Sequence, residues 1–399
     1  MNKDDKYSFF IGLFSFIPLR IIGLAYVSEV FLFLIFFFVS KNYFKTLKKI
    51  DFKAIGYLIL WFIGCVFASY YNNTSQLDFF KGTFTIISLI IIYISLNNYK
   101  NLSPSFYLYF ILGQFFSILI LNMFFNNLLL LDNIENNGLM FGFLKTFFII
   151  SFPLGLYLMS KYYSTKEKRK FYILLLIYSF GALIIGSRNQ FLVFSIVFVL
   201  FYFNYKRINA KMIIPFLISL LVIYQIYYQL ASSNYLGEYA YSKLVNQANS
   251  RIGIFSGRAT LIESLLAIYE NPIIGYGPYS FDYTDIKVRV YNFIYNKNIS
   301  ASEYLYYNPS SMDQHYVPRH SYILGAWVFS GILSVPFWVF YTRQVYKSII
   351  YALKYTNKYK FLVITCAIFM LWNIFFSPLA NRINLIMFLM FIYSLKNIK

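Results

Sequence analysis

The chain has 399 residues, of which 59% are hydrophobic and only 13% are charged. So few charges cannot coat the surface of a soluble protein of this length, and the composition therefore excludes an ordinary soluble domain. The formal net charge of +20 would suggest a nucleic-acid partner in a soluble protein. Here the basic residues lie mainly in short segments between apolar runs, where they orient a membrane protein, so we expect no nucleic acid.

Apolar runs that could cross a bilayer recur along the chain. They predict an all-α integral membrane protein, 1–399, forming a single domain of about 12 transmembrane helices, because each run matches the bilayer core. We place the spans near 7–19, 24–40, 54–70, 79–96, 105–124, 139–160, 171–186, 190–204, 212–230, 320–341, 361–377 and 381–395. The first two are separated because one helix over 7–40 would leave Arg20 and Glu29 in lipid.

The lysine-rich segments predict the orientation of these spans. Clusters at 41–53, 161–170, 206–211 and 343–360 fall on one side when the N-terminus is cytoplasmic. The positive-inside rule therefore places both termini in the cytoplasm. The long segment 231–319 then faces outward, and we expect it to form one large loop that contains short amphipathic helices.

Arginine does not follow the pattern of lysine. The arginines in segments predicted to face outward are Arg20, Arg188, Arg251, Arg258, Arg289, Arg319 and Arg382. Orientation does not distinguish the two residue types, whereas arginine is better suited to planar, bidentate recognition of phosphate or carboxylate. The pattern predicts a phosphorylated substrate anchored in the membrane. Anchoring to lipid headgroups, with ion pairs to Asp282, Asp285 or Glu303, is the alternative.

Two of these arginines occupy special positions. Arg188 lies in the polar run 187–190 between two predicted spans, at the membrane rim. Arg258 precedes the stretch 260–270, whose apolar residues recur with the helical period, and Asn271-Pro272 should end that helix. An anion bound there would satisfy both the guanidinium group and the free backbone N–H groups of the helix. A solvated arginine is the alternative.

The long loop ends at a histidine. His315 and His320 are the two histidines of the chain, and His320-Ser321, with Pro318 just before it, should open the span at 320–341. The positive end of that helix should lower the pKa of the His320 imidazole and favour the neutral form. A neutral imidazole is what a general base needs at neutral pH. A purely structural histidine is the alternative.

The run His320-Ser321, nine residues, then Gly331 resembles the His-[Asn/Ser/Gln]-x9-Gly signature of the O-antigen ligase and O-antigen polymerase (Wzy) superfamily. The stretch from Gly257-Arg258 to Asn271-Pro272-Ile273-Ile274-Gly275-Tyr276-Gly277-Pro278 is similar to the loop pattern of that superfamily, and Ser187-Arg188 also matches it. Ser334 departs from the ligase-type signature, which usually has Gly, Thr or Tyr there.

The resemblance implies a GT-C-like fold and inverting glycosyl transfer that needs no metal and no cofactor. Donor and acceptor would be glycans linked to undecaprenyl pyrophosphate. By this similarity His320 would act as the general base, and Arg188 and Arg258 would hold the pyrophosphate. Further candidates for binding substrate are Arg319, Arg289, Arg251, Tyr276 and Ser321. Tyrosine is abundant throughout the chain, so compositional bias is the alternative for Tyr276.

The resemblance favours an O-antigen polymerase of the bacterial inner membrane, with a periplasmic active site, membrane lipids around it and a chain-length regulator as an additional candidate partner. The alternative within the superfamily is the ligase, which passes the finished glycan to the lipid A core. A lipid-linked-glycan flippase is a third alternative. Flippases need charged residues lining a cavity within their spans, whereas the spans predicted here are almost free of charges.

Overall fold

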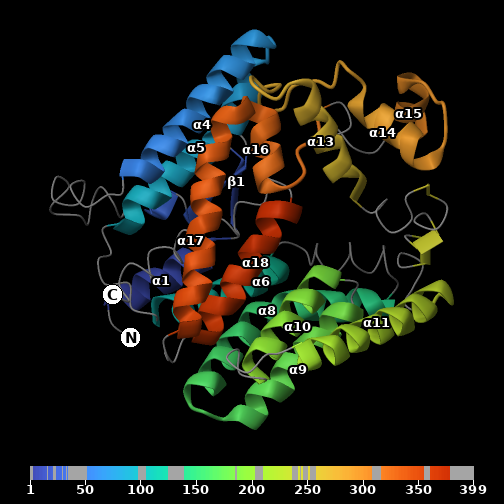
Figure 1. Cartoon of the computed structure of the whole chain (residues 1–399). Coiled ribbons are helices and arrows are strands. Elements are labelled where there is room, and N and C mark those ends of the chain that lie inside the picture. Colours follow the sequence, from blue (N-terminus) through green and yellow to red (C-terminus); the bar gives the residue numbers. More distant parts are fainter. Residues whose placement is uncertain are drawn as a thin grey trace. The chain divides into compact units, whose positions relative to one another are not determined.

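The computed structural model is largely helical (Figure 1). It describes residues 3–15, 17–20, 24–28, 30–32, 34, 52–97, 105–124, 139–184, 187–202, 210–235, 241–242, 244–245, 250–251, 258–307, 316–354 and 360–377. The chain forms two compact units. One comprises Met1–Ile17, Ser103–Asn246 and Lys347–Phe369, and the other comprises Pro18–Leu102, Gln247–Tyr346 and Met370–Lys399.

Helices occupy the spans predicted between 54 and 230. They are α4 (Phe52–Tyr71), α5 (Gln76–Asn97), α6 (Ser105–Phe124), α8 (Leu139–Ser164), α9 (Lys168–Ile184), α10 (Arg188–Tyr202) and α11 (Ala210–Ser232). The spans predicted at 320–341 and 361–377 are helical as well. They correspond to α16 (Tyr322–Ser330), the 3-10 helix η4 (Gly331–Ser334), α17 (Val335–Lys354) and α18 (Lys360–Phe376). The span predicted at 381–395 lies outside the described residues.

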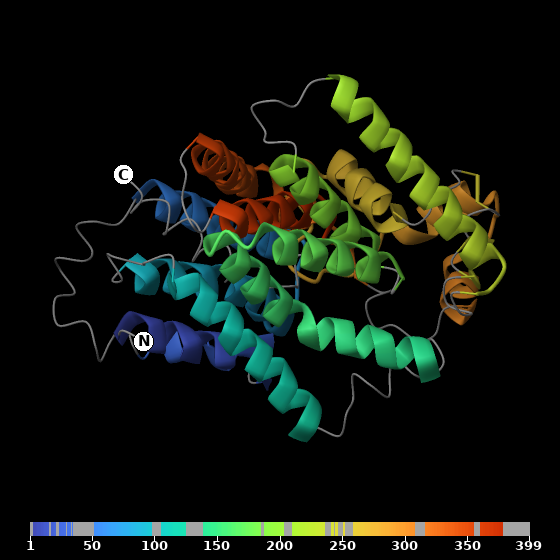
Figure 2. The same cartoon turned by 90° about the horizontal axis from the view of Figure 1, so that it is seen from below.

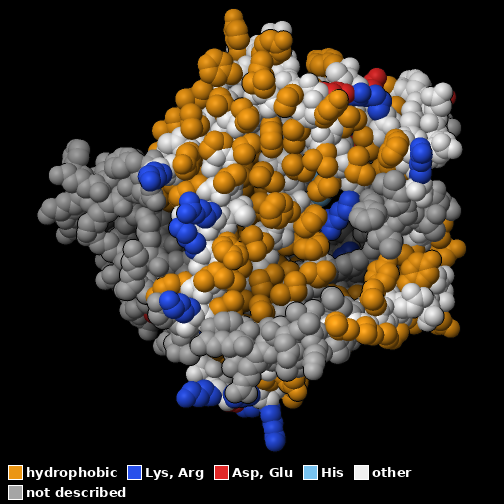
Figure 3. Space-filling model, viewed as in Figure 1, with side chains coloured by type: hydrophobic (Ala, Val, Ile, Leu, Met, Phe, Trp, Pro, Cys, Tyr) orange, Lys and Arg blue, Asp and Glu red, His pale blue; other side chains and the backbone are white. Residues whose placement is uncertain are grey.

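Within the described residues, the stretches Lys53–Tyr71 and Tyr322–Lys354 are long and apolar enough to cross a membrane. Three helical stretches are apolar but shorter, namely Leu108–Asn122, Asn189–Tyr202 and Lys360–Phe376. Large apolar side chains such as Phe67 and Val339 are exposed on α4 and α17. Figure 3 shows hydrophobic side chains gathered over this face. These features support a membrane protein of the helical class, while the number of spans stays a prediction.

The N-terminal region corrects the sequence analysis. Helix α1 covers Lys3–Leu13 and ends before the predicted limit at residue 19. Strand β1 (Pro18–Arg20) then pairs antiparallel with β2 (Leu24–Tyr26), so the helical prediction is wrong for these residues. Pro18 cannot sit in a helix interior without removing a hydrogen bond. Pairing of two short strands satisfies the backbone groups that a helix would otherwise have satisfied.

In the first unit, small residues allow close helix packing. A Cβ atom on Gly12 of α1 would lie 2.1 Å from the carbonyl oxygen of Phe110 of α6, and one on Gly113 would lie 2.2 Å from that of Phe9. Close approach through glycines is a typical way for membrane helices to associate. Helix α8 packs on α6 and α9, and α9 packs on α10, which Figure 2 shows from below.

In the second unit, the long loop contains three helices, α13 (Ala259–Glu270), α14 (Ile286–Tyr295) and α15 (Ala301–Tyr307). The predicted amphipathic helix at 260–270 is therefore confirmed. It ends at Glu270 with Asn271 as its C-cap, as the Asn-Pro pair predicted. Helix α13 packs against both α14 and α16 (Figure 1). The loop is thus a folded structure rather than an irregular connection over its described part.

The segment 271–277 binds through its backbone to the break between α16 and α17. The N–H groups of Tyr276 and Gly277 donate to the carbonyl oxygens of Val328 (2.7 Å) and Phe329 (3.1 Å). The N–H group of Ile332 donates to the carbonyl oxygen of Ile273 at 3.1 Å. Backbone N–H and C=O groups at η4 that make no α-helical hydrogen bond thereby bind the loop instead. Non-helical backbone in an apolar environment needs such hydrogen bonds. The two motifs noted in the sequence meet at this point.

Glycine is required on both sides of this contact. Gly275, Gly277 and Gly331 have φ values of +79°, +86° and +61°, which residues with a Cβ atom rarely adopt. A Cβ atom on Gly331 would lie only 1.9 Å from the carbonyl oxygen of Ile273. The Gly-x-Gly pattern of the loop and the glycine of the histidine signature therefore serve a single close approach of two backbones.

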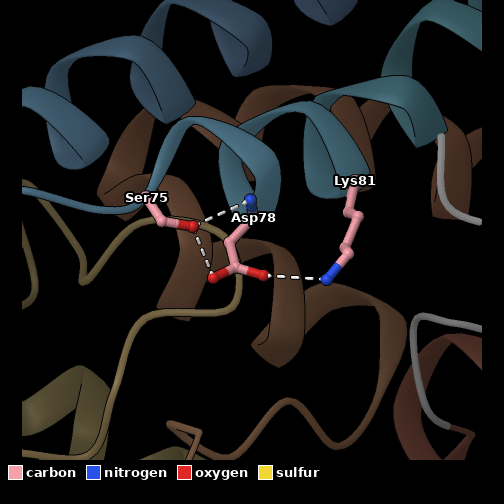
Figure 4. A network of polar contacts seen from close by, with 3 residues as sticks. All are labelled: Ser75, Asp78 and Lys81. Atoms are coloured by element: carbon pink, nitrogen blue, oxygen red, sulfur yellow. Dashed lines mark hydrogen bonds and ion pairs between the residues drawn. The ribbon is translucent and has the colours of Figure 1, made fainter.

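The turn between α4 and α5 supports the same loop from the other side. Asn72 Nδ2 donates to the carbonyl oxygen of Gly275 at 3.0 Å, and the hydroxyl groups of Thr74 and Ser280 lie 2.9 Å apart. The start of α5 is capped by Ser75, whose hydroxyl accepts the Asp78 N–H at 3.2 Å and donates to the Asp78 carboxylate (Figure 4). Lys81 forms an ion pair with Asp78 at 3.1 Å.

Replacing Gly331 by Ala should destabilise the protein by at least about 2 kcal/mol, because the new Cβ atom adds both backbone strain and a clash with Ile273. Thermal unfolding of the detergent-solubilised protein measures the effect. Gly56→Ala in α4 is the matched control, because a Cβ atom there meets nothing within 4 Å. Equal unfolding temperatures for the two variants would contradict the close approach.

Candidate functional site

His320 lies immediately before the helix that it was predicted to open. Helix α16 begins at Tyr322, and Ser321 is its N-cap. The Ser321 hydroxyl accepts the N–H of Leu324 at 2.9 Å, and the residue is fully buried. Ser321, a candidate for binding substrate, is therefore engaged in capping the helix.

The backbone of His320 is held by α13. Its N–H group donates to the Ser264 hydroxyl at 3.0 Å. That hydroxyl donates in turn to the carbonyl oxygen of Thr260, one turn earlier in α13, at 2.8 Å. Ser264 is fully buried. This chain of hydrogen bonds fixes the start of α16 to the loop helix.

The imidazole of His320 has one nitrogen bound and one without a partner. The carbonyl oxygen of Phe376, the last residue of α18, accepts a hydrogen bond from the ring. Nε2 is buried and has no hydrogen-bond partner among the described residues. Nδ1 is therefore the donor, and the neutral ring carries its lone pair on Nε2. This tautomer is the one in which Nε2 can accept a proton.

The pKa of the His320 imidazole lies below its ordinary value, as predicted, but for other reasons. Burial is the largest cause, the nearby positive charge of Arg258 is the second, and the hydrogen bond to Phe376 opposes both. The sequence analysis had assigned the effect to the helix dipole. The neutral form is favoured because a buried imidazolium beside a cation is doubly costly.

Arg258 lies next to His320 from a distant part of the sequence. It is the N-cap of α13 and is half-buried. Its guanidinium carbon lies 5.4 Å from the ring centre of Trp372 and 5.1 Å from that of Phe376. Such stacking engages the face of the guanidinium group, whereas its hydrogen bonds lie in its plane, so the two modes do not compete. The structure thus brings together Arg258 and His320 as the sequence predicted.

Arg319 lies beside His320 in sequence and is held by an aromatic ring. Its guanidinium carbon is 4.2 Å from the ring centre of Tyr279. Tyr279 has a left-handed backbone, with φ of 54°, and its ring contacts those of Tyr316 and Phe329. This segment therefore presents a stacked arginine next to the histidine, consistent with its candidacy.

Two other candidates are engaged in a network within the loop. Arg289 of α14 forms an ion pair with Glu270 of α13 at 2.6 Å. The Tyr276 hydroxyl donates to the other oxygen of Glu270 at 3.1 Å. Arg289 and Tyr276 together hold the pKa of the Glu270 carboxyl below its usual range, with the Arg289 hydrogen bond as the largest cause. The partner of Arg289 is thus Glu270, which was not among the acids considered from the sequence.

Arg251 lies apart from these residues in the loop. Its guanidinium carbon is 5.2 Å from the ring centre of Phe293. It lines an open depression with Ser250, Tyr295 and Asn296. Nothing in these contacts links Arg251 to His320, and its role in binding substrate stays a prediction.

Arg188 is the first residue of α10, and its place at the membrane rim stays a prediction. It belongs to the first unit, and its side chain lies outside the described part of the chain. Its predicted approach to Arg258 and His320 therefore stays a prediction. His315 and Arg382 are likewise outside the described residues, and so is the side chain of Arg20.

The structure adds three residues that the sequence analysis missed, namely Ser264, Trp372 and Phe376. Ser264 and Phe376 each bind His320, one through a hydroxyl and the other through a backbone carbonyl. A backbone carbonyl has no sequence signature. In a chain with so many aromatic residues, Trp372 and Phe376 gave no signal above the composition.

Glu263 is a further titratable group in α13, directly before Ser264. It is only 7% exposed. Burial raises the pKa of its carboxyl to about 7, while Lys287 lowers the pKa and Asp282 raises it. This carboxyl therefore changes its charge near neutral pH, inside the helix that holds His320.

Comparison with known families finds that residues 173–339 match the family described as O-antigen ligase. The matched segment includes Arg188, Arg258 and His320. It confirms the resemblance to the O-antigen polymerase and ligase superfamily that was predicted from the motifs. No curated protein matches the chain.

Replacing Glu263 by Gln should make stability less dependent on pH. Because the folded-state pKa of about 7 is raised above the ordinary 4.5, the wild-type contribution is complete below pH 4.5 and is lost as pH rises through 7. The uncharged Gln should therefore stabilise the protein at pH 8, by up to about 3 kcal/mol. Thermal unfolding in detergent at pH 5 and pH 8 measures this difference.

Glu303→Gln is the control for this measurement. Glu303 is exposed, and its pKa is lowered by hydrogen bonds from Ser300. Its replacement should not stabilise the protein at pH 8. An unchanged pH dependence in Glu263→Gln would show that the Glu263 carboxyl is not buried as described.

Proposed function

Because residues 173–339 match the family described as O-antigen ligase, we propose that the protein is a polysaccharide polymerase of the bacterial inner membrane. It transfers the growing glycan from one undecaprenyl pyrophosphate to a lipid-linked repeat unit. The match to this family supports an enzyme that acts on lipid-linked glycans. The choice of polymerase follows from the departure at Ser334 and from the Phe-, Tyr- and Ile-rich composition typical of such polymerases.

One observation carries the proposal. His320 has its Nδ1 bound to the Phe376 carbonyl and its Nε2 without a partner among the described residues, next to Arg258. A base and a cation side by side are the two groups that this transfer needs. Nε2 is buried without substrate, so binding of the acceptor has to open a path to it.

In the proposed chemical step, His320 takes a proton and Arg258 stabilises the leaving group. Nε2 of His320 takes the proton from an acceptor sugar hydroxyl, whose oxygen forms a bond to the anomeric carbon of the donor. The bond from that carbon to the pyrophosphate oxygen breaks, and the pyrophosphate leaves with the electron pair. Arg258, joined by Arg188, stabilises the charge that develops on it. Attack opposite to the leaving group inverts the anomeric centre. No metal and no cofactor takes part.

The proposal includes the orientation of the chain. About twelve spans place both termini in the cytoplasm and the segment 231–319 in the periplasm, in keeping with the lysine clusters of the opposite side. Arg319 and Arg251 bind the donor or acceptor at the loop surface, and a chain-length regulator is a candidate partner. Arg289 and Tyr276 contribute to binding only indirectly, because Glu270 engages both.

The ligase is the second candidate, and the description of the matched family favours it. Both reactions use the same donor and the same base, and they differ in the acceptor. In vitro synthesis from a purified lipid-linked repeat unit, with and without lipid A core, separates them. Polymer without the core supports the polymerase, whereas product that depends on the core supports the ligase.

Replacing His320 by Ala should abolish polymer formation in this assay, with a loss of at least about 100-fold, because the proposed general base is removed. Chain-length ladders on gels measure the product. His315→Ala is the matched control, since it changes the other histidine of the chain. Normal ladders from His320→Ala would remove this residue from the base role.

The rate should also depend on pH in a defined direction. Because the pKa of His320 is lowered from 6.5, the acid limb of kcat/KM should lie below pH 6.5, with full activity above it.

Arg258→Lys should lower kcat/KM by about 100-fold, because lysine lacks the planar fork that binds pyrophosphate. Wild-type kcat/KM for this variant would contradict the role of Arg258.

A further inference from the structure

The last turn of α18 contacts both functional residues, although it lies beyond the segment 173–339 that matches the family. Its carbonyl at Phe376 accepts the hydrogen bond from the His320 ring. Its side chains at Trp372 and Phe376 lie against the guanidinium group of Arg258. One helical turn therefore touches Arg258 of the long loop and His320, the residue that follows the loop.

The contact with His320 selects the tautomer. A helix leaves its last carbonyl groups without partners inside the helix. The imidazole satisfies the carbonyl of Phe376, and the donation fixes the proton on Nδ1. A ring turned by 180° about the Cβ–Cγ bond would exchange Nδ1 with Cδ2 and Nε2 with Cε1. It would lose both the hydrogen bond to Phe376 and the basic nitrogen from its present position. The end of α18 thus decides which nitrogen is basic.

The contact with Arg258 fixes the position of a charge. The Trp372 and Phe376 rings lie 4.6 Å apart, with an angle of 40° between their planes, and form one aromatic surface. The guanidinium carbon lies within 5.4 Å of both ring centres. The negative end of the α18 dipole and the two ring faces both attract a cation. They hold Arg258 close enough to His320 to act on its charge state.

We propose that Trp372 and Phe376 are positioning residues, which hold Arg258 and the His320 ring in the one arrangement where base and cation face the same substrate. This inference rests on the proposed function for its meaning in catalysis. The arrangement itself can be tested without any enzymatic assay. Neither residue touches the reacting atoms, so each acts through Arg258 or His320.

The first experiment measures the pKa of His320 directly. The chain has two histidines, so His315→Gln with isotope-labelled histidine leaves one imidazole signal for NMR titration in detergent. Trp372→Leu in this background should raise the pKa of His320 toward 6.5. Without the indole ring, Arg258 is no longer held near the imidazole, and its charge lowers the pKa less. Trp372→Phe, which keeps an aromatic face, should retain most of the lowered pKa.

A double-mutant cycle tests whether Trp372 acts through Arg258. Arg258→Gln alone should raise the pKa of His320, and adding Trp372→Leu should then change the pKa little. Equal effects of Trp372→Leu with and without Arg258 would overturn the proposal, and so would an unchanged pKa in Trp372→Leu. Phe375→Leu is the matched control, because this neighbouring ring is 43% exposed.

The second experiment measures polymer synthesis. Trp372→Leu should lower kcat/KM about tenfold and shift its acid limb to higher pH, and Trp372→Phe should restore both. Equal losses in the Leu and Phe variants with an unmoved acid limb would indicate packing alone and overturn the proposal. If Trp372→Leu does not fold, Phe376→Leu, which keeps the carbonyl, provides the same test.

These outcomes separate the two proposals. A shifted pKa together with full activity of His320→Ala would refute the proposed function but keep the positioning role. Loss of activity in His320→Ala, with a pKa that is insensitive to Trp372, would refute the positioning role alone.

Discussion

The hydrogen bonding of segment 271–277 to the helix break at Gly331 is the contact on which the second unit depends. At that break, α16 is followed by η4, and some backbone N–H and C=O groups lack a hydrogen-bond partner within the helix. The loop supplies the missing partners through three backbone hydrogen bonds to and from residues 328, 329 and 332. Only glycine permits the two backbone segments to come this close. Two motifs that are separate in sequence are therefore two halves of one contact.

The position of the site follows from this contact. Because α13 directly precedes segment 271–277, fixing that segment also fixes the end of the helix. The chain then returns beside the loop, where the Val317 N–H donates to the carbonyl oxygen of Ser280 at 2.9 Å. Three residues later it reaches His320, which meets Ser264 of α13. The end of the loop thus packs against its middle part, which places His320 beside α13.

The pKa of His320 depends on burial and on a neighbouring cation. The lowered pKa of His320 results from desolvation and from Arg258, so the ring is a neutral base beside a cation. Aromatic rings stabilise Arg258 without cancelling its charge. Arg289 has a different environment, because it forms an ion pair with Glu270.

The sequence by itself determined the helical membrane class, most helix positions and the amphipathic helix at 260–270, and it singled out Arg258 and His320, whose roles stay predictions. It could do so because apolar periodicity, helix ends and a rare residue such as histidine are local signals. It was wrong about the short strands at 18–20 and 24–26, where strand pairing replaces helix. Only the tertiary structure decided that Ser264 and the Phe376 carbonyl bind the histidine, that Trp372 contacts Arg258, and that Glu270 engages Arg289. Those contacts join residues far apart in the chain and use common residue types or backbone atoms, so no local pattern records them.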